Sequence, residues 1–212
     1  MNIYDVIILD ESGSMSSIYN ETLTSMNEVL GGIRRNQEGS PEQRHYVTIA
    51  TFEGNGIKGV KTRRDRVPIG AIAPFTVKDY QPGGCTPLYD AMGKTLNKLE
   101  GLILPDDKVM VTVITDGMEN SSQEYSGAVI KKLVARLRKK GWVLAYIGAN
   151  QDAVEVARGL NIGNSMNFEA SARVTIRMSK NLSRAMNLFQ KKAMCGVDLS
   201  KCNDLFDGID AV

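Results

Sequence analysis

Two carboxylates and three hydroxyls in this sequence have the chemistry of ligands for a hard metal ion. They lie in three short stretches: Asp10-Glu11-Ser12-Gly13-Ser14, Gly84-Cys85-Thr86 and Thr115-Asp116-Gly117. Oxygen ligands without a neighbouring imidazole or thiolate suit Mg²⁺ or Mn²⁺ and disfavour zinc. An Asp-x-Ser-x-Ser pattern alone is weak, because Asp and Ser are also favoured in turns and at helix N-caps. The metal site that we predict therefore needs all three stretches: Asp10, Ser12, Ser14, Thr86 and Asp116.

Two predicted strands bring these stretches together. Val6–Leu9 and Lys108–Thr115 are continuous apolar runs rich in β-branched residues, the pattern of strands that are covered on both faces. Asp10 and Asp116 come directly after them. Because the carboxyl ends of parallel strands meet at one edge of a sheet, the two carboxylates are expected to be neighbours.

The rest of the chain alternates between helical and strand patterns. Further strands are predicted at Tyr46–Phe52, Ile57–Val67, Trp142–Ile147 and Ser165–Phe168, with a hairpin turn at Gly54-Asn55-Gly56. The first helix is predicted from Ile18 to the Gly39-Ser40-Pro41 breaker. Further helices are predicted at Leu88–Leu102 with Thr86 as N-cap, Tyr125–Lys140 with Val129 on its apolar face, Asp152–Leu160 and Ser171–Met194. This order predicts an α/β fold: a Rossmann-like, doubly wound and mostly parallel sheet, with one antiparallel edge strand and helices on both faces.

Composition indicates an ordinary globular domain. The chain has 212 residues, a net charge of +2 and 42% hydrophobic residues, so neither disorder nor bulk attraction to nucleic acid is indicated. We predict one domain at residues 1–194 and leave the tail, residues 195–212, without an assigned structure. No apolar run approaches the roughly 20 residues of a membrane span, and no secretory leader precedes the first strand. Cys85, Cys195 and Cys202 form no Cys-x-x-Cys pair. Reduced thiols and a cytoplasmic location are therefore expected.

The three stretches together resemble the metal-ion-dependent adhesion site of von Willebrand factor A (vWA) domains. Asp10-Glu11-Ser12-Gly13-Ser14, Gly84-Cys85-Thr86-Pro87-Leu88-Tyr89-Asp90 and Thr115-Asp116-Gly117 match that motif in order and spacing. The match reaches from the first strand to about Phe168 and looks most like small stand-alone bacterial or phage members. The resemblance implies that Ser12, Ser14 and Thr86 touch the metal directly. It implies that Asp10 and Asp116 bind the metal directly or through water.

The resemblance also implies a function in protein binding. Neutral hydroxyl ligands leave a divalent ion only partly neutralised, so an open coordination position stays attractive to an anion. In adhesion domains of the family, an Asp or Glu of the partner protein fills that position. By resemblance, a role as adaptor beside kinase, phosphatase or ATPase systems is implied for this chain.

Other interpretations were weighed against this one. A metal-dependent phosphoester hydrolase is the alternative, but the sequence shows no recognisable nucleophile paired with a base, and His45 is expected at the surface or in a cap. Asp90 and Glu119 are interpreted as turn and loop carboxylates, and Glu11 as an outward-pointing rim residue. A nucleic-acid-binding protein is the less favoured alternative, through the basic residues at 63–66 and 131–140, which are interpreted as solvated faces because no aromatic residues are interleaved and the net charge is small. Nucleic acid is therefore not expected as a partner, and the lack of a long apolar run gives the same expectation for a membrane.

Overall fold

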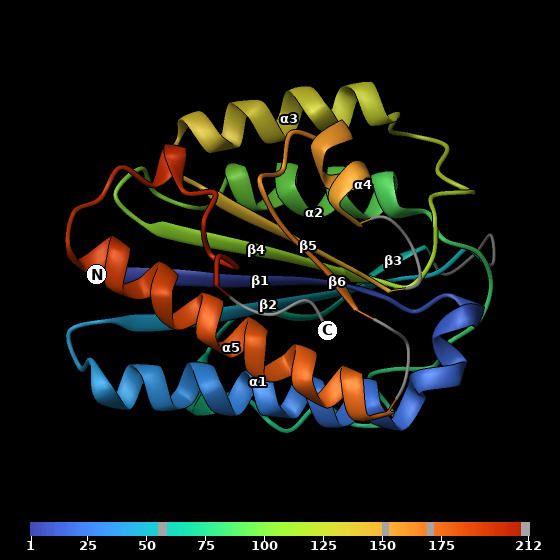
Figure 1. The fold of residues 1–212 in the computed structure, drawn as a ribbon, viewed down its shortest axis with the longest axis horizontal. Coiled ribbons are helices and arrows are strands. Elements are labelled where there is room, and N and C mark those ends of the chain that lie inside the picture. The colour runs from blue at the N-terminus through green and yellow to red at the C-terminus, as the bar shows by residue number, and fades with distance from the viewer. Residues whose placement is uncertain (55–58, 150–152, 169–171, 209–212) are drawn as a thin grey trace.

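The computed structural model describes residues 1–54, 59–149, 153–168 and 172–208. Its centre is a six-stranded sheet in the order β3-β2-β1-β4-β5-β6 (Figure 1). The strands are β1 (Asn2–Asp10), β2 (Arg44–Phe52), β3 (Val60–Pro68), β4 (Lys108–Thr115), β5 (Val143–Ala149) and β6 (Asn164–Phe168). All neighbours are parallel except β2 and β3, which confirms the predicted fold class and its antiparallel edge strand.

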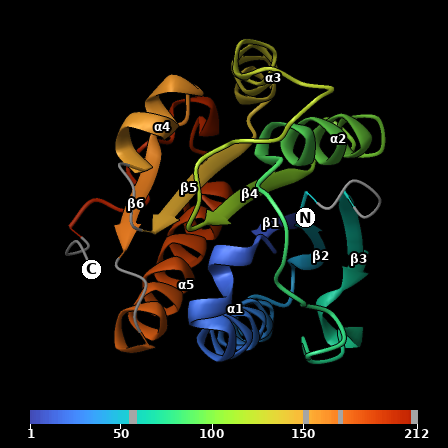
Figure 2. The same ribbon diagram turned by 90° about the vertical axis from the view of Figure 1, so that its right-hand side faces the viewer.

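Helices cover both faces of the sheet. They are α1 (Tyr19–Gly39), α2 (Leu88–Glu100), α3 (Gly127–Lys139), α4 (Ala153–Gly159) and α5 (Ala172–Met194), with short 3-10 turns η1 (Gly13–Ile18), η2 (Ile69–Ala71) and η3 (Leu199–Lys201). Figures 1 and 2 show α2, α3 and α4 on one face, and α1 and α5 on the other. The parallel neighbours that follow one another in the chain, β1 and β2, β4 and β5, and β5 and β6, are joined by crossovers through α1, α3 and α4.

The core consists of two apolar layers separated by the sheet. Along β1, Ile3, Ile7 and Leu9 join the layer under α1 and α5, whereas Val6 and Ile8 join the layer under α2 and α3. All five side chains are buried. The unbroken apolar run of β1 is explained because both faces of this strand need apolar side chains.

Most element predictions hold, and a few need correction. Val129 is exposed, and the buried face of α3 is instead formed by Ile130, Leu133, Val134 and Leu137. A 3-10 turn precedes α1, so the first helix begins at Tyr19. The predicted hairpin turn at Asn55 and Gly56, the strand start at Ile57, and the helix starts at Asp152 and Ser171 lie outside the described residues.

His45 is buried rather than at the surface, contrary to the prediction. Its Nδ1 lies 2.7 Å from Asp5 Oδ2, and its Nε2 lies 3.3 Å from Gln43 Oε1. His45 pairs in register with Ile3, near the start of β1, so it lies at the opposite end of that strand from Asp10. The residues next to His45 in the sequence did not indicate that its imidazole would meet the Asp5 carboxylate inside the core.

The C-terminal segment, for which no structure was predicted, packs against the domain. Leu199, Cys202 and Leu205 are buried in the layer under α1 and α5. Asn164 at the start of β6 binds the segment with both amide atoms, because Nδ2 donates to the Cys202 carbonyl at 2.9 Å and Oδ1 accepts from the Leu205 N–H at 3.0 Å. Residues 195–208 therefore belong to the folded unit. Among the described helices, none has the length and apolar character of a membrane span.

Candidate metal centre

Asp10 ends β1 as a buried carboxylate held from three directions. Its Oδ1 accepts the backbone N–H of Ser12 at 2.7 Å, and its Oδ2 accepts the hydroxyl of Thr115 at 2.5 Å. Its carbonyl accepts the hydroxyl of Tyr80 at 2.9 Å. The Asp10 side chain is 0% exposed. The carboxylate is thus fixed behind the turn of residues 10–14. We call this turn the metal turn, after the ion that the sequence predicts there.

The hydroxyls of the turn lead from Asp10 to Asp116. Ser12 Oγ lies 3.1 Å from Ser14 Oγ, and Ser14 Oγ donates to Asp116 Oδ1 at 2.6 Å. Ser12 is buried, Asp116 is half-buried and Ser14 is exposed. The adjacent pairing of β1 with β4 produces this contact across 102 residues, as the sequence predicted. Three oxygen groups therefore stand side by side at the solvent boundary.

Thr86 comes to the same place from a third loop. A Cβ atom added to Gly117 would lie 3.0 Å from Thr86 Oγ1 and 3.7 Å from Ser14 Oγ, so both hydroxyls border one point beside Asp116. Thr86 is not the N-cap that we predicted, because that position belongs to Pro87. Its backbone is instead bound by Asn120, whose Oδ1 accepts the Thr86 N–H at 2.9 Å. The Thr86 hydroxyl is consequently free of a capping role.

The backbone of the loop before Thr86 is joined directly to the metal turn. Gly13 donates its N–H to the Gly84 carbonyl at 3.1 Å. Gly84 has a φ of 72°, a conformation that costs glycine little and other residues more. The close approach of these two loops depends on that conformation.

Burial makes the ionised form of the Asp10 and Asp116 side chains unfavourable. It raises the pKa of Asp10 from its ordinary 3.8 to about 6, against the opposing effect of hydrogen bonds from Thr115 and Ser12. Burial also raises the pKa of Asp116. In the described part of the chain, no group of three or more His, Cys, Asp or Glu side chains is placed to hold a metal ion. A site of two carboxylates and three hydroxyls fits a hard divalent cation, which would relieve the unfavourable burial.

Two carboxylates near the site have structural roles, as predicted. Asp90 accepts the backbone N–H groups of Gln123, Glu124 and Tyr125 at 2.9–3.0 Å. Glu119 accepts those of Tyr89, Ser121 and Ser122 at 2.7–2.9 Å. Together they fasten the loop after Asp116 to the start of α2. The sequence did not indicate that Asn120 would bind the Thr86 backbone, because this contact exists only once the loop after Asp116 packs against the loop before α2.

Glu11 was predicted to point outward at the rim of the site, but its side chain is fully buried. Both of its carboxylate oxygens accept from the Arg63 guanidinium, at 2.9 and 3.0 Å, and Oε1 also accepts the Gln81 N–H at 2.5 Å. The Glu11 carbonyl accepts the Gly83 N–H at 2.9 Å. Arg63 therefore belongs to a buried ion pair rather than to a solvated basic cluster. This pair joins β3, the metal turn and the loop that leads to Thr86.

Replacing Glu11 by Gln is expected to weaken metal binding about 10-fold and to lower the free energy of unfolding by about 2–4 kcal/mol. The amide keeps one acceptor but leaves the Arg63 guanidinium without its anion, which loosens the loop before Thr86. Calorimetric Mg²⁺ titration and urea unfolding measure the two effects. Asp65→Asn removes a carboxylate from β3 that pairs with exposed Lys98, and it should change neither quantity noticeably. Equal metal affinity in Glu11→Gln and the wild type would contradict this role.

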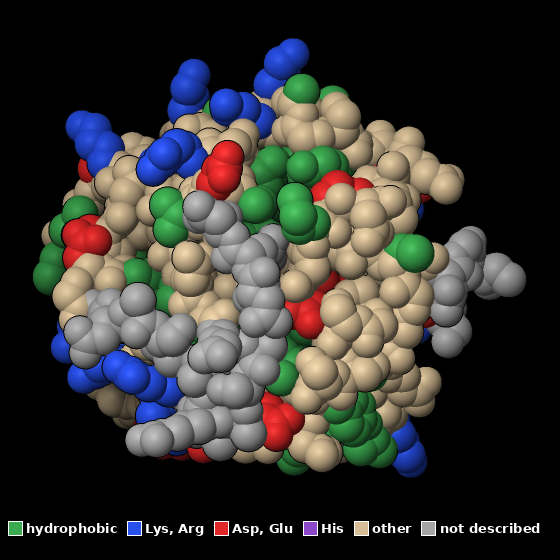
Figure 3. Space-filling view, turned by 45° about the vertical axis from the view of Figure 1, so that its right-hand side comes forward, with side chains coloured by type: hydrophobic (Ala, Val, Ile, Leu, Met, Phe, Trp, Pro, Cys, Tyr) green, Lys and Arg blue, Asp and Glu red, His purple; other side chains and the backbone are tan. Residues whose placement is uncertain are grey.

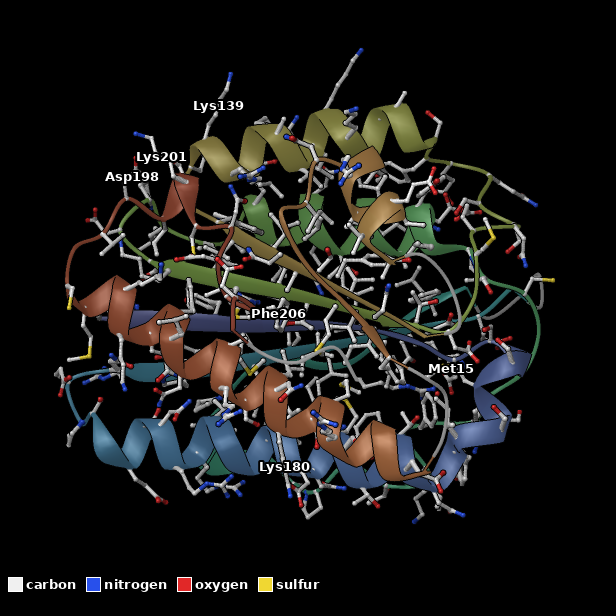
Figure 4. The ribbon with its side chains drawn as sticks, viewed as in Figure 1. Met15, Lys139, Lys180, Asp198, Lys201 and Phe206 are labelled. Carbon is white, nitrogen blue, oxygen red and sulfur yellow. The ribbon has the colours of Figure 1, made fainter. Side chains whose placement is uncertain are left out.

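Met15 anchors the metal turn on its inner side. This residue is buried beside Ser14 and faces an apolar cavity that is also lined by Leu9, Ile114 and Met178 (Figure 4). The cavity walls come from β1, β4, α1 and α5. The position of the turn therefore depends on apolar packing below it as well as on hydrogen bonds.

No protein-family model matches this sequence, and no curated protein matches it. Solved structures do share its fold. The Rpn10 VWA domain is 10% identical, with a TM-score of 0.58 over 84% of this chain and 94% of that one. Manganese-loaded TRAP protein of Plasmodium vivax is 13% identical, with a TM-score of 0.52 over 82% and 71%. Proximal thread matrix protein 1 of the mussel byssus is 15% identical, with a TM-score of 0.56 over 86% of this chain, which spans only 45% of the mussel chain. The fold is that of a vWA domain.

Proposed function

We propose that this chain is a metal-dependent protein-binding module. Mg²⁺ or Mn²⁺ would be held by Asp10, Ser12, Ser14, Thr86 and Asp116, and an Asp or Glu of a partner protein would complete its shell. One observation carries the proposal: hydroxyl and carboxylate side chains from three separate loops meet at one point beyond β1 and β4, already ordered by hydrogen bonds.

The donor set explains why the partner should be anionic. Three of the five groups are neutral hydroxyls, and Asp10 has both carboxylate oxygens engaged by Ser12 and Thr115. When bound, the cation would supply positive charge that the protein only partly neutralises, at the solvent boundary where Ser14 is exposed. A carboxylate from another protein is a strong ligand for such an ion.

One structural neighbour is compatible with metal binding at this fold. The TRAP protein of Plasmodium vivax has the same fold and is manganese-loaded. Identities of 10–13% carry the fold alone, so the metal and the adaptor role are inferred from the residues of this chain.

A phosphoester hydrolase is less well supported. A hydrolase would need a base that activates water beside the metal. His45, the sole histidine of the sequence, is buried against Asp5 at the far end of β1. Within the described residues, the carboxylates closest to the site along the chain, Glu11, Asp90 and Glu119, are all engaged in structural bonds.

Asp116→Ala tests the proposal. We expect calorimetry to show Mg²⁺ or Mn²⁺ binding to the wild type and a loss of roughly 100-fold in the variant, because the half-buried carboxylate at the solvent boundary is removed. Asp106→Ala is the matched control, since Asp106 is an exposed carboxylate in the loop before β4. Failure of the wild type to bind either ion would overturn the proposal.

The partner half of the proposal needs a separate test. Immobilised wild type in Mg²⁺ should retain a protein that EDTA releases and that immobilised Asp116→Ala does not retain. Substituting Asn or Gln for each acidic residue in the binding region of that protein should identify one whose loss abolishes retention. A partner that binds equally well with EDTA present would contradict a metal bridge.

A further inference from the structure

The exposed face of α5 is entirely cationic over most of its length. The helix has 23 residues and contains no Asp or Glu. Between residues 177 and 191, the exposed residues are Arg177, Lys180, Arg184 and Lys191. Their spacing of three, four and seven residues puts them along one side of the helix. We call this set the α5 stripe; Lys180 is labelled in Figure 4, where α5 passes α1.

The α5 stripe borders a groove whose second wall is α1. Two adjoining hollows along this groove are lined by Glu28, Gly32, Arg35 and Asn36 of α1 and by Arg177, Lys180, Asn181, Ser183, Arg184 and Asn187 of α5. The helices meet closely, because a Cβ on Gly32 would lie 2.9 Å from Ser183 Oγ. Asn187 Nδ2 donates to Asn36 Oδ1 at 3.0 Å across the floor. The described lining of the groove thus contains four cations, one carboxylate and several neutral hydrogen-bonding groups.

Many basic residues elsewhere form ion pairs within the chain, whereas Arg35, Lys180, Arg184 and Lys191 form none with the described residues. Arg63, Arg64 and Arg66 on β3 pair with Glu11, Asp79 and Asp65, and Arg136 and Lys140 both pair with Glu100. Across the described residues, Lys180, Arg184, Lys191 and Arg35 have no carboxylate within ion-pair distance. Figure 3 shows Lys and Arg side chains at the lower left, where α5 comes into view. Like charges held together without partners repel one another, so an external anion would stabilise them.

We propose that the α1–α5 groove binds the phosphodiester backbone of nucleic acid without sequence preference. An acidic protein segment would need apolar anchors, and the exposed positions of the stripe provide none. A bilayer presents a flat surface, which does not fit the two adjoining hollows of this groove. Phosphates are recognised by Arg and Lys charge together with Asn and Ser donors, which is the composition of these walls. Among the described residues, no aromatic side chain lines either hollow, so the contact that we propose is to the backbone and not by base stacking.

The length of the α5 stripe limits how many phosphates it can contact, and that number sets how strongly salt should weaken binding. Lys191 lies 14 residues beyond Arg177, which at about 1.5 Å per residue spans roughly 21 Å, or about six base pairs of one strand. If about three phosphates are neutralised, raising NaCl from about 50 to 200 mM should weaken duplex binding roughly 40-fold. This proposal departs from the expectation drawn from net charge and from the basic residues of β3 and α3, because the local cluster on α5 is visible only in the folded chain.

Fluorescence anisotropy with a labelled 20-base-pair duplex of random sequence tests the proposal. The wild type should bind in 50 mM NaCl with the stated salt dependence. Lys180→Glu, Arg184→Glu and Lys191→Glu combined should weaken binding at least tenfold, and the corresponding Gln triple at least threefold. The matched control combines Lys131→Glu, Lys132→Glu and Lys139→Glu, because these three lysines of α3 are also exposed. The control variant should bind the duplex within about threefold of the wild type.

Several results would overturn the proposal. These are no duplex binding by the wild type, an equal loss in the α5 and α3 triples, or tighter binding to polyglutamate or to phosphatidylserine vesicles than to the duplex. The Gln triple, with circular dichroism of all variants, separates lost charge from lost folding. Asp116→Ala should bind the duplex as the wild type does, so failure here and failure of the metal-dependent function are distinguishable.

Discussion

Replacing Asp10 by Asn is expected to weaken Mg²⁺ binding by roughly 100-fold or more and to stabilise the metal-free protein at pH 7.5. Burial raises the pKa of Asp10 from 3.8 to about 6, so the ionised carboxylate is unfavourable in the folded protein without a cation. At about 1.4 kcal/mol for each unit of pKa, removing the charge should raise the free energy of unfolding by about 1–3 kcal/mol.

The surroundings of Asp10 can accept an amide without rearrangement. The Asn Oδ1 would accept the Ser12 N–H, as Asp10 Oδ1 does at 2.7 Å. Its Nδ2 would donate to Thr115 Oγ1, whose hydroxyl could turn to the Gly117 carbonyl, 3.0 Å away. Shape and hydrogen bonds are thus conserved while the charge is lost. The substitution separates the role of Asp10 in metal binding from its effect on folding.

The same shift predicts how pH changes the stability of the metal-free wild type. Because folding raises the pKa of Asp10, its contribution is favourable when the group is protonated in both states, below pH 3.8, and that contribution is lost as pH rises through about 6. The stability difference between Asp10→Asn and the wild type should therefore grow from pH 4 to pH 7. Urea unfolding in EDTA at several pH values measures it. A difference that does not depend on pH, or an Asn variant that binds Mg²⁺ normally, would contradict the assignment.

Replacing Gly93 by Ala is expected to lower the free energy of unfolding by about 2–4 kcal/mol and the melting temperature by roughly 5–10 °C. A Cβ at this position in α2 would overlap the Cγ and Cδ1 atoms of the Tyr125 ring. Those atoms are close to the backbone and cannot move without shifting the loop that Asp90 holds through the Tyr125 N–H. Because that loop begins at Asp116, metal affinity should fall as well.

Gly39→Ala is the control for backbone effects. Gly39 is the last residue of α1, and nothing lies within 4 Å of a Cβ built there. Alanine should therefore leave stability unchanged or raise it by up to about 1 kcal/mol. Thermal unfolding with and without Mg²⁺ compares the two variants. If Gly93→Ala is as stable as Gly39→Ala, the close contact between α2 and Tyr125 is not a packing constraint.

The fold could be predicted because its signals are local. The apolar runs of β1 and β4 end in polar turns, and helical periodicity separates them from the next strands. The antiparallel edge position of β3 was also predicted, and its charged sequence does not suit a strand covered on both faces. Proximity of Asp10, Ser14 and Asp116 followed from strand order alone, because parallel neighbours end at the same edge.

Residues with long-range partners could not be predicted in this way. The sequence next to Glu11 does not show that Arg63, 52 positions away, reaches it, and so a buried anion looked like a rim residue. The contact between His45 and Asp5, which are 40 residues apart, was missed for the same reason. Thr86 was predicted as an N-cap because its backbone contact with Asn120 could not be foreseen. Polar residues can enter a core only when specific partners meet them there.

The sequence by itself determined the sheet, the order of its elements and the residues offered to a metal ion, because side-chain type and period express these directly. Tertiary structure decided which polar groups are neutralised. It paired Glu11 with Arg63 and Glu100 with Arg136, and it fastened the C-terminal segment to Asn164. It left Lys180, Arg184 and Lys191 of the α5 stripe without a carboxylate within ion-pair distance among the described residues. The reason is physical: the energy of a charge depends on burial and on what lies within a few ångströms, and only the packed chain sets both.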